Sequence, residues 1–278
     1  MKRRIPDLGK LLFVLPNLFT LSSVLCGFYA ITTLTRAHGE ASSFINASLA
    51  IVFAGFFDGM DGRVARLTRT QTDFGVQLDS LADLISFGVA PALLVHEWAL
   101  SGLGWPGLIA SFTFLAAGAA RLARFNVMSA RGENPSNVFV GLSIPLAAVA
   151  VISLVVACIK LDVDVQSHAQ WVALYIVLLS FLQVSTVRFR SFKTLKLSPL
   201  SVFGLTFGLV APIAVALALG QPWLMLIIFT VGYIVWGLIE HAVWMIRGSS
   251  VVDESEASSS DNDGEEIRNY ENDDDQNL

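Results

Sequence analysis

The chain has 278 residues, of which 54% are hydrophobic and 15% are charged, and its mean hydropathy is +0.63. This composition excludes an ordinary water-soluble globule and indicates an integral membrane protein. The net charge of −5 does not describe this apolar body, because the acidic excess is concentrated at the carboxyl end. We therefore expect membrane lipids, and not nucleic acid, as partners.

The amino end, residues 1–12, combines lysines and arginines with leucine and isoleucine, which favours a short amphipathic helix at the cytoplasmic surface. Apolar runs of roughly 20 residues follow, which is the length a helix needs to cross a bilayer. We predict an all-α polytopic membrane protein whose transmembrane catalytic domain covers residues 13–247. About eight transmembrane helices are expected, near residues 13–34, 44–66, 80–99, 105–126, 139–160, 170–187, 200–219 and 222–246.

Basic residues are distributed unevenly between the two ends of these spans. The segments on one side hold only Arg36 and Lys160, so the positive-inside rule places both termini in the cytoplasm. The opposite segments hold Lys2, Arg3, Arg4, Lys10, Arg63, Arg66, Arg69, Arg121, Arg124, Arg131, Arg188, Arg190, Lys193, Lys196 and Arg247.

The last segment, residues 248–278, is rich in serine, aspartate, glutamate and asparagine. It has too little apolar surface to form a core, so we predict a disordered acidic tail on the cytoplasmic side.

Four carboxylates interrupt the second and third apolar regions: Asp58, Asp61, Asp79 and Asp83. Intramembrane carboxylates are costly and mark functional sites. Asp58 and Asp61 are three residues apart, and Asp79 and Asp83 are four apart, so each pair shares one helical face. Two facing helices would gather all four into a cage for hard divalent cations with room for a phosphate. Asp73, by contrast, is expected in the turn between the two helices.

The pattern Asp58-x2-Asp61-Gly62-x2-Ala65-Arg66-x8-Gly75-x3-Asp79-x3-Asp83 resembles the complete signature of the CDP-alcohol phosphatidyltransferases, with every position and spacing matched. The resemblance implies that a lipid phosphatidyl group passes from a CDP-lipid to an alcohol in one step, with release of CMP. It also implies two divalent ions, Mg²⁺ or Mn²⁺, and a homodimer.

The resemblance further implies a role for each motif residue. Asp58, Asp61, Asp79 and Asp83 would bind the metals, and Asp83 would also be the general base for the acceptor hydroxyl. The CDP-binding residues would be Asp61, Gly62, Ala65, Arg66 and Gly75, joined by Asn17 and Thr20 at the start of the first span. A second interpretation of the Pro16-Asn17 step is an ordinary helix start.

Three further segments, Leu15 to Thr20, Arg121 to Asn126 and Phe139 to Pro145, resemble the CDP-diacylglycerol–serine O-phosphatidyltransferase branch, as does Asp79 to Pro91. The resemblance implies CDP-diacylglycerol and L-serine as substrates, and a prokaryotic cytoplasmic membrane as the location.

Arg121 and Arg124 lie three apart and are candidate acceptor-binding residues, although they would also serve as positive-inside anchors. Their chemistry does not choose among acceptors, so a sister enzyme that uses glycerol 3-phosphate or an inositol derivative stays open. A non-enzymatic alternative is a transporter whose intramembrane carboxylates move cations.

Overall fold

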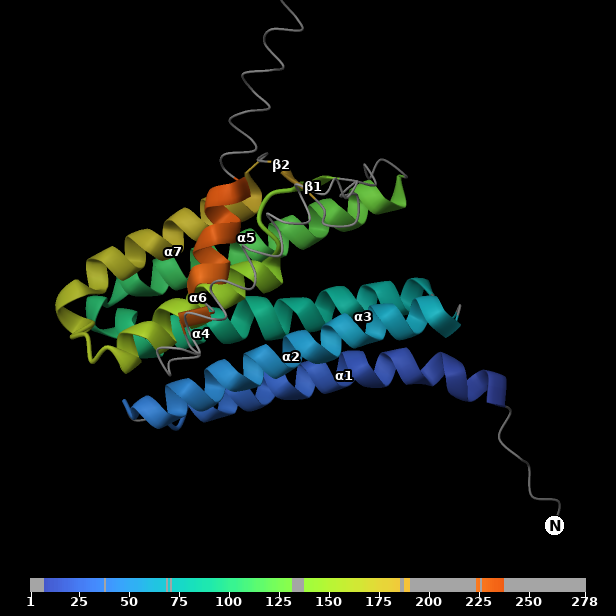
Figure 1. Ribbon diagram of the computed structural model, residues 1–278, viewed down its shortest axis with the longest axis horizontal. Coiled ribbons are helices and arrows are strands. Elements are labelled where there is room, and N and C mark those ends of the chain that lie inside the picture. The colour runs from blue at the N-terminus through green and yellow to red at the C-terminus, as the bar shows by residue number, and fades with distance from the viewer. Residues whose placement is uncertain are drawn as a thin grey trace, which may run out of the picture.

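The computed structural model of the protein describes residues 8–37, 39–68, 70, 72–131, 138–185, 188–190, 224–225 and 227–237. Helices dominate this part of the chain and lie alongside one another in an elongated bundle (Figure 1). They are α1 (Leu8–Leu34), α2 (Ala41–Thr68), α3 (Asp73–Asp83), α4 (Ala90–Val95), α5 (Trp105–Ala130), α6 (Ile144–Lys160) and α7 (Ala169–Val184). The described residues also include two 3-10 turns, Ser101–Leu103 and Gln166–His168, and a helical stretch, Ile227–Gly237.

Five helical stretches are long and apolar enough to cross a bilayer, so the chain has the architecture of a multi-pass membrane protein. They are Leu15–Leu34, Ala41–Thr68, Asp73–Leu103, Trp105–Ala130 and Gln166–Val184. Two apolar helices, Ile144–Lys160 and Ile227–Gly237, are shorter.

The predicted total of eight spans and a separate amino-terminal amphipathic helix are not confirmed. The span predicted at 200–219, part of the one at 222–246 and the acidic tail at 248–278 lie outside the described residues. Residues 1–7 do so as well, and from Leu8 onward the chain is already part of α1.

The third span begins earlier than the predicted residue 80. Asp73 is the first residue of α3, where a turn was expected, because Thr72 caps the helix by accepting a hydrogen bond from the Gly75 amide at 3.0 Å. A carboxylate in the first turn also interacts favourably with the helix dipole. The prediction for Asp73 was therefore wrong, and the helix begins about two turns earlier than expected.

This helix continues to Leu103 through two wide π-helical segments, η1 (Leu84–Val89) and η2 (His96–Leu100). In the first of these, the Ala90 amide donates to the Ile85 carbonyl, five residues earlier, just before Pro91. Proline lacks an amide proton, and local π turns are one way in which a membrane helix accommodates it.

Small residues allow the helices to approach closely near the middle of the bundle. A Cβ atom placed on Gly27 of α1 would lie 2.7 Å from Ser86 Oγ and 2.9 Å from Ser86 Cα, so α1 and η1 touch at this point. Ser86 Oγ donates to the Ser23 carbonyl at 3.0 Å. Interfaces built from small residues such as glycine and serine are typical of membrane helix packing.

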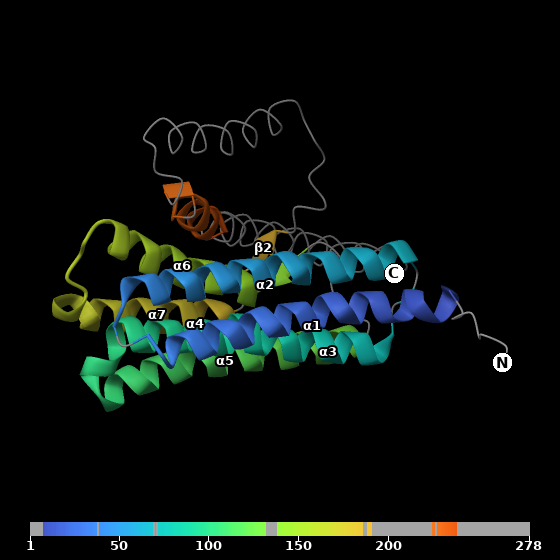
Figure 2. The ribbon, with the colours of Figure 1, turned by 90° about the horizontal axis from the view of Figure 1, so that it is seen from below.

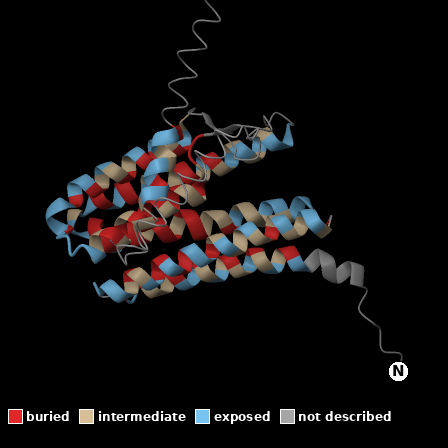
Figure 3. Ribbon diagram, viewed as in Figure 1, coloured by how far each residue is buried: buried red, intermediate tan, exposed pale blue. Residues whose placement is uncertain are grey.

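The helices also lie side by side when the bundle is turned by 90° (Figure 2). Buried residues follow the contacts between helices, and exposed residues follow the outside of the bundle (Figure 3). The largest fully buried apolar side chains are Phe87, Phe114, Ile51, Leu94, Leu100, Leu142, Ile144, Ile152, Ile176 and Leu179. Large apolar side chains such as Leu25, Phe53 and Phe181 are exposed, which suits helices surrounded by lipid.

A short antiparallel ribbon pairs β1 (Val138–Val140) with β2 (Arg188–Arg190), with Phe139 opposite Phe189. The span predicted from residue 139 was therefore wrong at its start, and α6 begins at Ile144. The reason is local, because Gly141 has a positive φ of 79° and a proline occupies the first turn of α6.

Gly141 is also the point where this loop meets the end of α7. An added Cβ would lie 2.4 Å from the Gln183 carbonyl oxygen. We expect Gly141→Ala to lower the stability of the purified protein by about 1–3 kcal/mol from overpacking alone, seen as a lower melting temperature in detergent. Gly232→Ala is the control, because a Cβ there would have no atom of the described residues within 4 Å. Equal melting of both variants would contradict this account.

Candidate functional site

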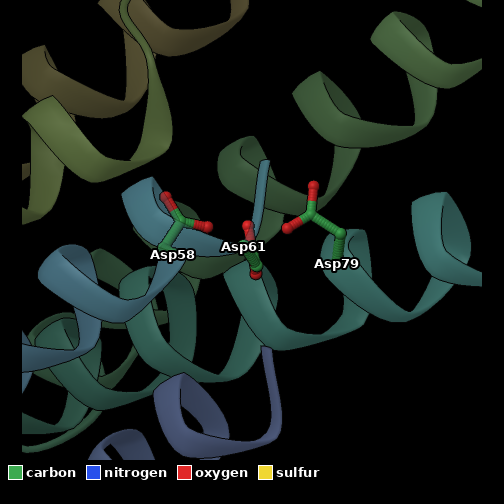
Figure 4. Close-up of side chains that lie close together, drawn as sticks. All are labelled: Asp58, Asp61 and Asp79. Atoms are coloured by element: carbon green, nitrogen blue, oxygen red, sulfur yellow. The ribbon is translucent and has the colours of Figure 1, made fainter. Parts of the chain in front are cut away.

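Three carboxylates come together where α2 faces α3. Asp58 and Asp61 lie on α2 and Asp79 on α3, and one oxygen atom from each lies within 4.8 Å of the other two (Figure 4). Asp61 is buried, and the other two are partly buried. The three-residue spacing turns Asp58 and Asp61 to the same face of α2, which is why a single residue from α3 can meet both.

Asp83 joins this group through Asp58. It lies one turn beyond Asp79 on α3, and its carboxyl group is a neighbour of the Asp58 carboxyl. Its Oδ1 atom is buried and has no hydrogen-bond partner among the described residues. The structure therefore groups three of the four predicted carboxylates, and Asp83 lies next to one of them, Asp58.

These residues fit a divalent cation. Four carboxylates at such close range repel one another unless positive charge lies between them. Carboxylate oxygens are also the ligands that Mg²⁺ and Mn²⁺ prefer, and the unpartnered oxygen of Asp83 leaves a ligand atom available.

Thr20 of α1 orients one of the carboxylates. Its buried hydroxyl lies 2.8 Å from Asp61 Oδ2, to which it donates, and 3.2 Å from the Pro16 carbonyl. Contacts of this kind fix the rotamer of a metal ligand. Sequence reasoning assigned Thr20 to the nucleotide and missed this role, since nothing in the spacing indicates which carboxylate a residue 41 positions away will meet.

Asn17 and Gly75 are neighbours across α1 and α3. A Cβ atom on Gly75 would lie 3.6 Å from Asn17 Oδ1 and 3.2 Å from Thr72 Oγ1. Gly62 is more open, since among the described residues a Cβ there would meet only Arg66 Nη2, at 4.0 Å. The described residues therefore leave the backbone next to Asp61 uncovered. Arg66 is exposed one turn after Gly62, and the neighbouring Ala65 is half-buried.

The two arginines of α5 differ in their surroundings. Arg121 is only 8% exposed, lies in the electrostatic field of Asp83, and its Nε atom finds no acceptor within the described part of the chain. Arg124 donates to the Val184 carbonyl at 3.0 Å and to the Ser185 carbonyl at 3.5 Å. It therefore binds the carboxyl end of α7, where a cation also complements the helix dipole.

Asn126 ties α5 to α3 beside the carboxylates. Its Nδ2 atom donates to Ser80 Oγ at 2.9 Å, and Ser80 follows Asp79 directly. Sequence reasoning quoted Asn126 as the end of a motif without giving it a role. Its polarity inside an apolar span was the signal that could have identified it.

Residues 13–183, more than half of the chain, match the family described as CDP-alcohol phosphatidyltransferase. The chain is 36% identical over 240 residues to a protein of Helicobacter pylori named CDP-diacylglycerol–serine O-phosphatidyltransferase, covering 85% of this chain and 94% of the relative. Proteins with the same name from Mycobacterium tuberculosis and Bacillus subtilis are 29% and 31% identical. They cover 81% and 64% of this chain, and 77% and 91% of their own lengths respectively.

The contact between Thr20 and Asp61 predicts an effect on metal binding. Thr20→Val keeps the volume but removes the hydroxyl that holds Asp61, so we expect Mn²⁺ affinity to fall about 10-fold or more. The measurement is titration of purified protein with Mn²⁺, followed by electron paramagnetic resonance of the free ion. Thr20→Ser, which keeps the hydroxyl, serves as the matched control, and unchanged affinity in Thr20→Val would show that the contact is unimportant.

Proposed function

Since the chain belongs to the CDP-alcohol phosphatidyltransferase family, we propose that it transfers the phosphatidyl group of CDP-diacylglycerol to the hydroxyl of L-serine, giving phosphatidylserine and CMP. The observation that carries the proposal is the convergence of Asp58, Asp61 and Asp79, with Asp83 in contact with Asp58. The choice of serine is supported by the names of the relatives, which match this chain over most of its length.

Asp58, Asp61, Asp79 and Asp83 would hold two divalent ions, Mg²⁺ or Mn²⁺. When bound, such ions draw negative charge from a pyrophosphate and stabilise the departing phosphate. The serine oxygen would form a bond to the phosphorus that carries the diacylglycerol, and the bond from that phosphorus to the CMP oxygen would break. Asp83, with its buried and unpartnered Oδ1, is the group that would take the hydroxyl proton.

The nucleotide would lie over the open backbone near Asp61. Gly62, Ala65 and Gly75 leave room for it, and Arg66 would meet phosphate oxygens. Asn17 would add a polar contact from α1, whereas Thr20 would act mainly through Asp61.

Arg121 would bind the acceptor, since it is buried and lies in the field of Asp83. Arg124, the second predicted acceptor residue, would support it by holding the end of α7 in place.

The protein would lie in a prokaryotic cytoplasmic membrane, with both termini and the carboxylate cluster toward the cytoplasm. The distribution of basic residues supports this orientation. The start of α1, the end of α2, the start of α3 and the end of α5 all lie at one end of the bundle, as the orientation requires (Figure 1). A homodimer is part of the proposal by family resemblance.

The reaction is tested by CMP release from purified protein in detergent with CDP-diacylglycerol, Mn²⁺ or Mg²⁺, and L-serine present or omitted. We expect serine-dependent CMP that disappears with a chelator and falls at least 100-fold in Asp83→Asn, because the base is lost. Asp73→Asn removes an exposed carboxylate six residues before Asp79 and serves as the control with wild-type activity. CMP formed with glycerol 3-phosphate or an inositol phosphate, but not with serine, would overturn the choice of acceptor.

The orientation is tested with single cysteines in a Cys26→Ala, Cys158→Ala background. Ser167→Cys lies in the turn before α7 and should react with a membrane-impermeant maleimide in intact cells. Ser129→Cys, near the end of α5, should react only after the membrane is permeabilised. The reverse pattern would place the carboxylates on the outer side.

A further inference from the structure

Gln183 is a polar side chain that the proposed chemistry has not used. It lies in the last turn of α7 and is fully buried. Neither its Oε1 nor its Nε2 atom has a hydrogen-bond partner in the portion of the chain that the structure describes. Buried amides are almost always hydrogen-bonded, so an amide with both ends unpaired indicates that a partner is supplied from elsewhere.

The amide points into the contact between α5, α6 and α7, which lie together in the bundle (Figure 1). A Cβ atom placed on Gly118 of α5 would lie 3.3 Å from Gln183 Oε1 and 3.6 Å from Ile144 Cδ1 of α6. Gly118 thus leaves the space that the amide faces, and Ile144 forms an apolar wall beside it.

The Gln183 amide also lies at nearly the same level along the bundle axis as Asp83. The helix formed by α3 and η1 runs antiparallel to α5, and two contacts define the register between them. Asn126 bonds Ser80, and a Cβ on Gly88 would lie 3.2 Å from Leu115 Cδ1. This register brings residue 121 of α5 opposite Asp83, and Gly118 lies one turn, about 5 Å, deeper.

Three groups without a hydrogen-bond partner therefore lie at similar levels along the bundle, on α3, α5 and α7. They are Asp83 Oδ1, Arg121 Nε and the Gln183 amide, none of which finds a partner in the described ranges. One acid, one cation and one neutral amide are complementary to a small molecule with a hydroxyl, a carboxylate and an ammonium group.

We propose that Gln183 is a specificity-determining residue of the acceptor site, where its amide oxygen binds the ammonium group of the amino-acid acceptor. Arg121 takes the carboxylate, and the hydroxyl is left beside Asp83. This inference rests on the proposed function and goes beyond it by naming the residue that selects a zwitterion. An acceptor with a phosphate dianion is matched less well, because Arg124, the other arginine on α5 near this site, is bonded to the end of α7.

The test is steady-state kinetics of Gln183→Met, which keeps the volume and removes the amide. We expect KM for L-serine to rise about 10- to 100-fold, the range for one hydrogen bond to a charged group. KM for CDP-diacylglycerol should stay within about twofold of wild type. The melting temperature in detergent should stay the same or rise, because an unpaired buried amide has been removed from the free enzyme.

Ser180→Ala is the matched control. Ser180 is buried one turn earlier on α7, and its hydroxyl bonds the Ile176 carbonyl of its own helix, so its loss should leave KM for serine unchanged. A second comparison uses 3-hydroxypropionate, which lacks the ammonium group. Wild type and Gln183→Met should use this acceptor equally poorly.

The possible negative results of this test distinguish the assignment of Gln183 from the proposed function. If wild type turns over serine and Gln183→Met has an unchanged KM for serine, the assignment of Gln183 is overturned and the proposed function stands. A lower melting temperature together with equal rises in both KM values would show a structural role, and this would also overturn it. Wild type that forms no serine-dependent CMP would overturn the proposed function and this inference with it.

Discussion

Mutual repulsion among four carboxylates is the constraint on which the arrangement of this protein depends. Asp58 and Asp61 of α2 meet Asp79 of α3 within 4.8 Å, and Asp83 contacts Asp58. In apolar surroundings such charges interact far more strongly than in water. Thr20 relieves part of the cost by donating to Asp61, and bound cations would relieve the rest. In the proposed function, the groups whose repulsion is costly are therefore the same groups that would bind hard cations.

The surrounding helices hold this cluster through a small number of polar contacts. Ser86 bonds the Ser23 carbonyl just past Asp83, at the point where Gly27 lets α1 touch η1. On the other side, Asn126 bonds Ser80. The helix that carries two of the four carboxylates is therefore tied to α1 and to α5 within two turns of the site. Such ties limit how far the carboxylates can separate.

The carboxylate cluster was predictable because residue spacing on helices maps directly onto faces, and the motif residues are close in sequence. The contacts that these residues make with other helices were harder to predict from the sequence. The contact of Thr20 with Asp61 and the unpaired amide of Gln183 depend on the packing of helices far apart in the chain. Apolar length located the five candidate spans of the described residues but not their ends: the cap at Thr72 extended one of these helices, and Gly141 delayed the start of the shorter helix α6.

The π-helical turn after Asp83 has a consequence for how the third span evolves and can be redesigned. A wide turn is equivalent to one extra residue in an ordinary helix. Deleting a single residue from Leu84–Val89 would restore the regular pitch and leave the downstream face, which includes Leu94, turned toward its present partners. The same deletion in a regular helical turn would rotate that face by about 100° relative to Asp79 and Asp83. The wide turn is therefore the place in this span where the length of the helix can change by one residue without disturbing either the carboxylates or the packing beyond them.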